Sequence, residues 1–238
     1  MTQHKYNRIL LKISGEGLLG GKEFGIEPER MTEIAQELVE VKQLGVQLGV
    51  VVGGGNIFRG LSGISLGIDR IAGDFIGMLA TIMNSLALQT VLEKRFDVDT
   101  RVLSEVEVPQ LAEPYIRRRA IRHLEKGRIV IFAGGTGKPF FTTDTAAALK
   151  AAEVSADVLL KATRVDGVFS DDPEKNPNAT FYKKLPYRDV LSSNLRVMDS
   201  TAVSMCMENS IPIVVFNFSK PGNLIEVVRG KTIGTTIS

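Results

Sequence analysis

The chain has 238 residues, of which 44% are hydrophobic and 24% are charged, a composition typical of a soluble globular protein with one large domain or two small ones. Its net charge of +2 gives the chain as a whole no electrostatic reason to bind nucleic acid, so that any anion site must be local. The single cysteine, Cys206, excludes an internal disulfide framework, and neither a signal-peptide pattern nor an apolar run of about 18 residues is present; we therefore expect a cytoplasmic protein without a membrane span.

Apolar runs rich in β-branched residues alternate along the chain with longer stretches in which apolar residues recur at helical spacing. In chain order, these patterns predict a strand at 8–14, a helix at 28–45, a strand at 46–54, a helix from Asp69 to about Arg95, a strand at 100–104, a helix at 113–127, a strand at 128–135, a helix at 143–154, a strand at 156–163, a helix at 199–210, a strand at 211–217 and a helix at 221–230.

Several of the predicted strands are apolar throughout rather than alternating. Such strands are buried on both faces, which is typical of a parallel sheet covered by helices. We predict an α/β fold, a three-layer α/β/α sandwich with a mainly parallel central sheet, formed by residues 1–238 as a single domain. The least regular stretch, 166–189, is rich in Pro, Asp and Asn and is predicted to contribute a ligand contact rather than a domain boundary.

A Gly-rich turn follows the strand at 128–135, in the stretch AGGTGKPFFTTDTAAALK (133–150). It is not a Walker A loop, because Pro139 follows Gly137-Lys138 and Phe132 stands where the first Gly is required. The run GGGNIFRG (53–60) likewise fails the dinucleotide fingerprint, since Phe58 occupies the place of the third Gly. The chain therefore carries neither of the two commonest nucleotide-binding motifs.

The ingredients of an anion site remain in that turn. The N-terminus of the following helix offers unpaired amides, and Thr136, Thr142 and Thr143 add hydroxyl donors. The alternative is an ordinary strand–turn–helix in which Thr143 or Asp144 is the N-cap. Asp144 would repel a bare phosphate, so it is predicted to cap the helix or to meet a cation.

Two lysines interrupt apolar strands: Lys12 in ILLKIS and Lys161 in VLLKAT. A buried ammonium without a counter-charge is unfavourable, and either lysine alone could be a strand-end residue whose ammonium reaches solvent. Ligands of parallel sheets bind beyond the carboxyl ends of the strands, and both lysines lie near such ends. Together with the Gly-rich loops, they favour a shared polyanion.

Other charged residues leave two interpretations open. Arg59 is either a surface residue or a donor fork for phosphate, and Asp74 is either a first-turn acid favoured by the helix dipole or an acceptor for ribose hydroxyls. The basic run 117–126 is either a solvated helix face or a surface for a polyanionic effector or another subunit. Cys206 is predicted to be a core thiol, and His4 and His123 are too isolated to suggest a transition-metal site.

At these residues the sequence resembles the amino-acid kinase superfamily and, within it, the bacterial uridylate kinases. The resemblance covers nearly the whole chain and is most specific in GGGNIFRG and TGKPFFTTD. It implies transfer of the γ-phosphoryl group of ATP, with Mg²⁺, to UMP, in pyrimidine nucleotide biosynthesis. Lys138 stands where we expect Asn in many relatives, and Phe169 where some have Tyr.

The resemblance also implies a set of site residues. The ATP side would comprise Lys12, Ile13, Ser14, Gly15, Gly55, Arg59, Thr163, Phe169 and Asp172. The UMP side would comprise Gly54, Asp74, Thr136, Gly137, Lys138, Pro139, Phe140, Phe141, Thr142 and Thr143. The catalytic groups would be Lys12, Arg59 and Lys161, with Asp144 and Asp199 organising the lysines or the metal; the chain itself is not expected to provide a separate metal site.

Further implications concern regulation and assembly: GTP as activator, UTP as inhibitor, and a homohexamer. Two other hypotheses stay open. The chain could be a different kinase of the superfamily acting on a carbamate or a small acidic substrate, or a non-catalytic nucleotide-sensing regulator.

Overall fold

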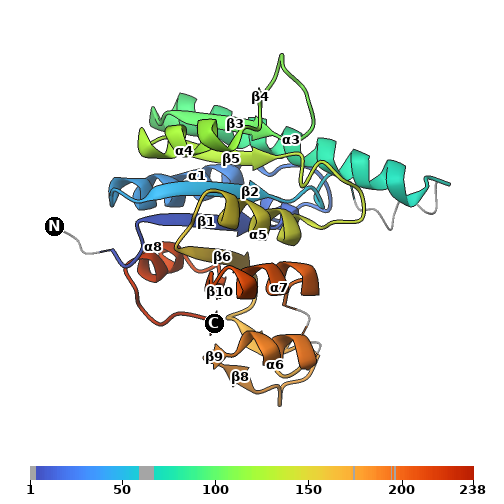
Figure 1. Ribbon diagram of the computed structural model, residues 1–238, viewed down its shortest axis with the longest axis vertical. Helices are drawn as coiled ribbons and strands as arrows, with labels where there is room; N and C mark the ends of the chain where they lie inside the picture. The colour runs from blue at the N-terminus through green and yellow to red at the C-terminus, as the bar shows by residue number, and fades with distance from the viewer. Residues whose placement is uncertain (1–3, 59–66, 174, 194, 196) are drawn as a thin grey trace.

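The computed structural model describes residues 4–58, 67–173, 175–193, 195 and 197–238. Within them, a nine-stranded sheet runs through the molecule with helices on both faces (Figure 1). In spatial order its strands are β4 (Glu113–Pro114), β3 (Thr100–Ser104), β5 (Ile129–Ala133), β2 (Gln47–Val52), β1 (Arg8–Ile13), β6 (Val158–Thr163), β10 (Ile213–Asn217), β11 (Thr235–Ile237) and β9 (Lys184–Leu185). Among these described strands, β10 and β11 pair antiparallel and the other neighbours pair parallel. The predicted sandwich with a mainly parallel sheet is confirmed.

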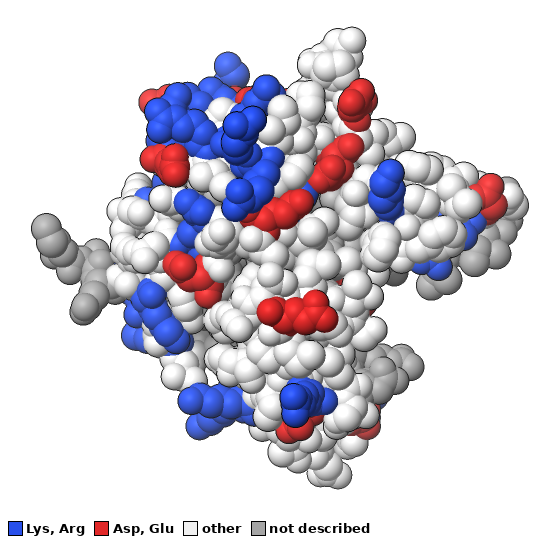
Figure 2. Space-filling view, in the orientation of Figure 1, with Lys and Arg blue, Asp and Glu red and all other residues white. Residues whose placement is uncertain are grey.

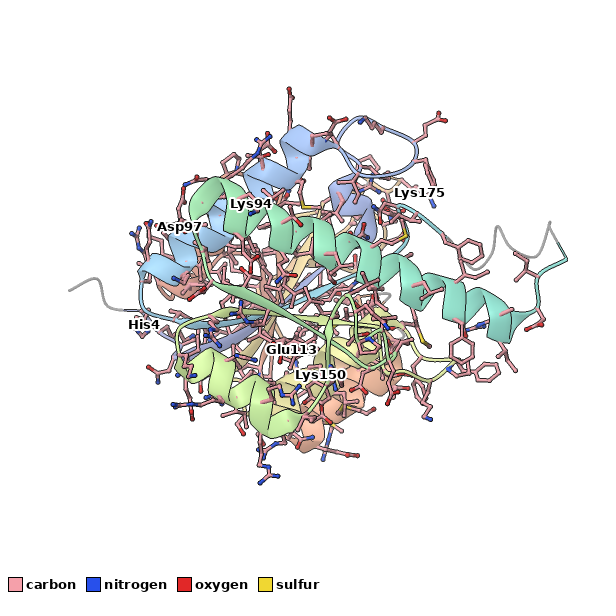
Figure 3. The ribbon with its side chains drawn as sticks, turned by 90° about the horizontal axis from the view of Figure 1, so that it is seen from above. His4, Lys94, Asp97, Glu113, Lys150 and Lys175 are labelled. Carbon is pink, nitrogen blue, oxygen red and sulfur yellow. The ribbon has the colours of Figure 1, made fainter. Side chains whose placement is uncertain are left out.

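Helices cover the two faces of the sheet in separate groups. One face carries α1 (Pro28–Gln43), α3 (Arg70–Phe96) and α8 (Asn223–Val228). The other carries α4 (Arg117–Glu125), α5 (Thr143–Glu153), α6 (Tyr187–Ser192) and α7 (Ser200–Glu208). Seen from above, α1 and α3 lie along one side of the sheet and α4 along the other (Figure 3).

Strand periodicity decides which face each central side chain joins, because successive side chains of a strand point to opposite faces. In β1, Leu11 packs in the core under α1 and α3, whereas Leu10 packs under α5 and α7. In β6, Leu160 and Leu159 divide in the same way. The residues two positions beyond Leu10 and Leu159 therefore point to the α5 face, and these are the two strand lysines.

One helix boundary was predicted wrongly. The helix expected over 113–127 begins at Arg117, because Glu113 and Pro114 pair with β3 as the edge strand β4. Tyr115 N–H also donates to Ser104 O at 2.9 Å. Proline disfavours the helical conformation in the residue before it, so the chain stays extended through this pairing.

The irregular stretch 166–189 contains short elements that the sequence pattern did not reveal. Strands β7 (Val168–Phe169) and β8 (Phe181–Tyr182) form a separate antiparallel pair. The edge strand β9 and the start of α6 follow. Residues 167–173 of this segment line a cavity together with Thr163, the last residue of β6.

Helix α3 is long and apolar enough, by length and composition, to cross a membrane, and 44% of its most apolar window is buried inside the protein. It packs on α1 and on strands β2, β3 and β5, as the core helix of a globular protein does. Its exposed apolar side chains Ile71, Phe75, Leu79 and Met83 recur every four residues. They therefore form one stripe along the helix, which we call the α3 stripe.

Candidate active site

The strand lysines stand side by side at the centre of the sheet. Lys12 and Lys161 are register partners on the parallel strands β1 and β6, and both point to the face covered by α5. Strand order reverses at β1, whose neighbours β2 and β6 lead to opposite halves of the sheet. Ligands of open parallel sheets bind beyond the strand ends at such a switch point.

One carboxylate holds both ammonium groups. Asp144 Oδ1 lies 2.8 Å from Lys12 Nζ, and Asp144 Oδ2 lies 2.6 Å from Lys161 Nζ. Burial by itself raises the pKa of Asp144, but the charges of Lys12 and Lys161 outweigh it and hold that pKa below its ordinary value. The prediction that Asp144 meets a cation is confirmed.

The surroundings of Lys161 disfavour its charged form. Burial lowers the pKa of Lys161, and the positive charge of Lys12 lowers it further. The negative charge of Asp144 acts in the opposite direction and raises that pKa. The Lys161 ammonium also donates to the carbonyl oxygen of Val197. An incoming phosphate would favour the ammonium form of Lys161 further, because a nearby anion raises the pKa of an amine.

The N-terminus of α5 is capped differently from the prediction. The N-cap is Thr142 rather than Thr143 or Asp144: its Oγ1 accepts from Asp144 N at 3.1 Å and from Thr145 N at 3.3 Å. The pattern TTD offers three adjacent capping side chains, and only the backbone path decides among them. With Thr142 as the cap, the Asp144 side chain is free to reach the lysines.

Asp199 fixes α5 relative to α7. Its carboxylate accepts from Thr145 Oγ1 at 2.9 Å, from the Thr142 hydroxyl, and, as the N-cap of α7, from Ala202 N at 2.8 Å. These contacts orient the first turn of α5, which carries Asp144. Asp199 therefore acts on the lysines through that turn, and its charge also raises the pKa of Lys161 directly.

Glycine lets the loops after β1 and β2 pack against each other. A Cβ on Gly15 would lie 2.5 Å from Gly55 N and 2.8 Å from Gly53 O, and a Cβ on Gly54 would lie 2.7 Å from Gly77 O in α3. No side chain fits at such distances. These loops and the first half of α3 therefore form one wall.

Two buried amides that sequence reasoning missed fix this wall. Asn84 Nδ2 donates to Gly53 O and to Asn56 Oδ1, both at 2.7 Å, and Asn56 Nδ2 donates back to Asn84 Oδ1 at 3.0 Å. Both side chains are buried. An amide inside the apolar run of α3 is a signal that could have identified Asn84, because buried polar groups are hydrogen-bonded.

A second missed cluster supports the turn after β5. Lys150, fully buried in α5, pairs with Glu105 and Glu153. Glu105 packs against Gly137, where a Cβ would lie 3.2 Å from Glu105 Cβ. Figure 3 shows Lys150 between the sheet and α4. This ion pair links α5 to the Gly134–Gly137 turn.

A cavity of about 530 Å³ lies beyond the carboxyl end of β6. Thr163, Phe169, Asp172 and Val197 belong to its lining. The Phe169 ring packs on Phe181 with ring centroids 5.2 Å apart. The predicted ATP residues Thr163, Phe169 and Asp172 are therefore brought together here.

A second cavity, of about 470 Å³, lies between the glycine loops, α3 and the turn after β5. Of the residues predicted for UMP, its lining includes Gly54, Asp74, Thr136, Phe141, Thr142 and Thr143. Gly55, assigned by resemblance to ATP, lines it too. Ile13 is the last residue of β1, and Ser14 and Gly15 follow it directly. Gly137, Lys138, Pro139 and Phe140 form the loop beside the cavity, and Arg59 lies outside the described residues.

The lysine pair lies beside residues that line each of the two cavities. Lys161 contacts Val197 of the first cavity, and its partner Asp144 follows Thr143 of the second. The arrangement can hold two anionic ligands whose charged ends meet at the lysines. Cys206, in contrast, is fully buried in α7, and burial, with the Asp199 charge, raises its pKa to about 12, so it is a core thiol.

Comparison with known proteins identifies the family to which this fold belongs. A model of the amino acid kinase family matches residues 7–217. The chain is 42% identical to the solved UMP kinase of Bacillus anthracis (TM-score 0.95, covering 98% of this chain and 96% of that one). It is 37% identical to the UMP kinase of Ureaplasma parvum (TM-score 0.92, 98% and 99%) and 30% identical to the uridylate kinase of Archaeoglobus fulgidus (TM-score 0.75, 97% and 99%). The chain belongs to the amino acid kinase family.

Proposed function

We infer that the chain is a UMP kinase, which transfers the γ-phosphoryl group of ATP to UMP and releases ADP and UDP. The observation that carries this inference is the pair Lys12 and Lys161, joined by Asp144 between two separate cavities. Similarity to UMP kinases over nearly the whole chain supports the choice of substrates.

The cavity that holds Phe169 is proposed to bind the adenosine of ATP, and the triphosphate to run along the turns after β1 and β2. The ATP residues would be Lys12, Ile13, Ser14, Gly15, Gly55, Arg59, Thr163, Phe169 and Asp172. The second cavity is proposed to bind UMP through Gly54, Asp74 and residues 136–143. Its glycine turn and the N-terminus of α5 supply backbone donors for the UMP phosphate.

In the proposed step, an oxygen of the UMP phosphate attacks the γ-phosphorus, and the bond from that phosphorus to the bridging oxygen of ADP breaks. The transition state spreads negative charge over the transferring group. Lys12 and Lys161 relieve the repulsion between the two anions and stabilise that charge. The attacking phosphate oxygen is already anionic near neutral pH, so the step requires no general base.

Mg²⁺ is proposed to enter as part of the MgATP substrate. The two acids near the lysines are engaged already, Asp144 by both ammonium groups and Asp199 by Thr142, Thr145 and Ala202 N–H. This suits an ion held largely by substrate phosphates and water, the usual coordination of Mg²⁺. Bound there, Mg²⁺ would neutralise phosphate charge.

Regulation and assembly are proposed by family resemblance: a homohexamer in the cytoplasm, built from single-domain subunits, with GTP as activator and UTP as inhibitor. The α3 stripe supports a subunit contact, because exposed apolar surface of this kind marks interfaces. The basic surface of α4 supports an anionic effector or a second contact; Figure 2 shows Lys and Arg side chains gathered over this helix, where Arg117, Arg118, Arg119 and Arg122 are exposed.

The experiment is a coupled ADP-release assay with purified protein, MgATP and a panel of acceptors. UMP is expected to be phosphorylated rapidly, and CMP and dUMP poorly. Equal turnover of the three nucleotides, or turnover of carbamate or a small acid instead, would contradict the inference, and nucleotide binding without turnover would favour a sensor. Adding GTP or UTP to the same assay, and measuring mass by light scattering, tests the proposed effectors and hexamer.

A further inference from the structure

Asp74 of α3 is held from two sides before any ligand arrives. Arg70, one turn earlier in the helix, places its Nε 3.1 Å from Asp74 Oδ1 and 3.0 Å from Oδ2. Phe140 N–H, from the loop after β5, donates to Asp74 Oδ2 at 2.7 Å. The carboxylate therefore joins two walls of the second cavity, α3 and the 136–142 loop.

The loop adopts an unusual backbone conformation at this contact. Phe140 has φ 74°, in the left-handed region that residues with a Cβ seldom adopt. The Phe140 ring lies beside the Arg70 guanidinium, with Cζ 5.7 Å from the ring centroid, a cation–π arrangement. Arg70, Asp74 and Phe140 thus form one unit, which we call the Asp74 clamp.

The clamp leaves Asp74 able to bind a ligand. A carboxylate has about four lone-pair positions. Among the contacts of the described residues, Oδ2 accepts from Arg70 and from Phe140 N–H, whereas Oδ1 accepts from Arg70 alone. Asp74 also lines the cavity, and its side chain is 18% exposed. A hydroxyl in the cavity can donate to it.

The charge of Arg70 matters as well as its geometry. A lone carboxylate in a cavity for a nucleotide phosphate would repel that ligand. Arg70 supplies the compensating positive charge. Its side chain is not part of the cavity lining and is 65% exposed. An ion pair with one partner this exposed contributes little to folding stability, so loss of Arg70 should leave the fold intact.

We propose that Arg70 is a positioning residue that sets the preference for ribose over deoxyribose in the acceptor: it aims the Asp74 carboxylate at the sugar hydroxyls and neutralises it toward the phosphate. This inference rests on the proposed UMP kinase function. It adds a residue that does not touch the substrate but acts through one that does.

The test compares kcat/KM for UMP and dUMP in wild type, Arg70→Ala and Arg70→Lys. In Arg70→Ala, the KM for UMP is expected to rise and the UMP/dUMP ratio of kcat/KM to fall, each by roughly tenfold, as for one weakened hydrogen bond to a charged group. The KM for ATP should not change. Arg70→Lys should restore the KM for UMP most of the way to the wild-type value, because it restores the positive charge. It should restore less of the UMP/dUMP ratio of kcat/KM, because lysine lacks the flat guanidinium contact.

Arg229→Ala is the matched control, since Arg229 forms a similar helical ion pair with Glu226 at the end of α8. It should leave both kinetic constants and the ratio unchanged, and all variants should keep the wild-type unfolding midpoint. An unchanged UMP/dUMP ratio in Arg70→Ala, with UMP turnover in wild type, overturns the role of Arg70. A wild type that does not phosphorylate UMP instead overturns the proposed function, and this inference with it.

Discussion

Replacing Lys161 with alanine is expected to lower kcat for UMP phosphorylation by roughly 10²–10³, the effect of removing one donor to developing negative charge. The folded protein should tolerate the change, because burial already disfavours the Lys161 ammonium in the absence of a phosphate. Asp144 keeps its contact with Lys12 at 2.8 Å. The measurement is steady-state kcat, together with a urea unfolding curve.

Lys184→Ala provides the comparison, because Lys184 lies exposed in β9, an edge strand of the same sheet. It should retain wild-type kcat. If Lys161→Ala and Lys184→Ala turn over UMP equally well, Lys161 has no part in the transfer.

Asp144→Asn is expected both to slow turnover, by roughly 10²–10³, and to destabilise the protein. It leaves two buried ammonium groups side by side without their shared counter-charge; removing one partner of a buried ion pair destabilises by roughly 3 kcal/mol or more. The pKa of Asp144 is lowered in the folded state, so the stabilisation that it provides is complete above its unfolded pKa of about 4 and is lost as the pH falls through the folded value.

Urea unfolding at pH 7 and at a series of acid pH values measures this difference. The stability gap between wild type and Asp144→Asn should be full at pH 7 and narrow only in strong acid. Asp189→Asn, an exposed acid in the first turn of α6, should stay within about 0.5 kcal/mol of wild type. A gap that widens toward acid pH would mean that Asp144 is not stabilised as a carboxylate.

The central sheet and the lysine pair could be predicted because strong local signals set them. The long strands are continuous apolar runs, and one lysine interrupts each of two such runs near its carboxyl end. Ligand binding at the carboxyl ends of parallel strands then required the two to meet. That the two side chains also share a face depends on the register between β1 and β6, which the structure supplies.

Other parts depend on contacts distant in sequence. Strands β4, β7, β8 and β9 have only two residues each, too few for a periodic pattern, so their neighbours decide them. Contacts distant in sequence also decide three features of the site: the choice of Thr142 as N-cap, the Asn56–Asn84 pair and the Lys150–Glu105 link. Arg70 escaped notice because a surface arginine gains its meaning only when Phe140, 70 positions later in the chain, reaches Asp74.

If the two cavities meet at Lys12 and Lys161, donor and acceptor phosphates share one site. The most direct measurement is calorimetric binding of a bisubstrate in which one polyphosphate chain joins adenosine to uridine. We expect one bound molecule per chain, tighter binding than for ATP or UMP alone, exclusion of both nucleotides, and weaker binding in Lys161→Ala. A bisubstrate that binds no more tightly than ATP, or that leaves UMP able to bind alongside it, would show that the two cavities do not meet at the lysines.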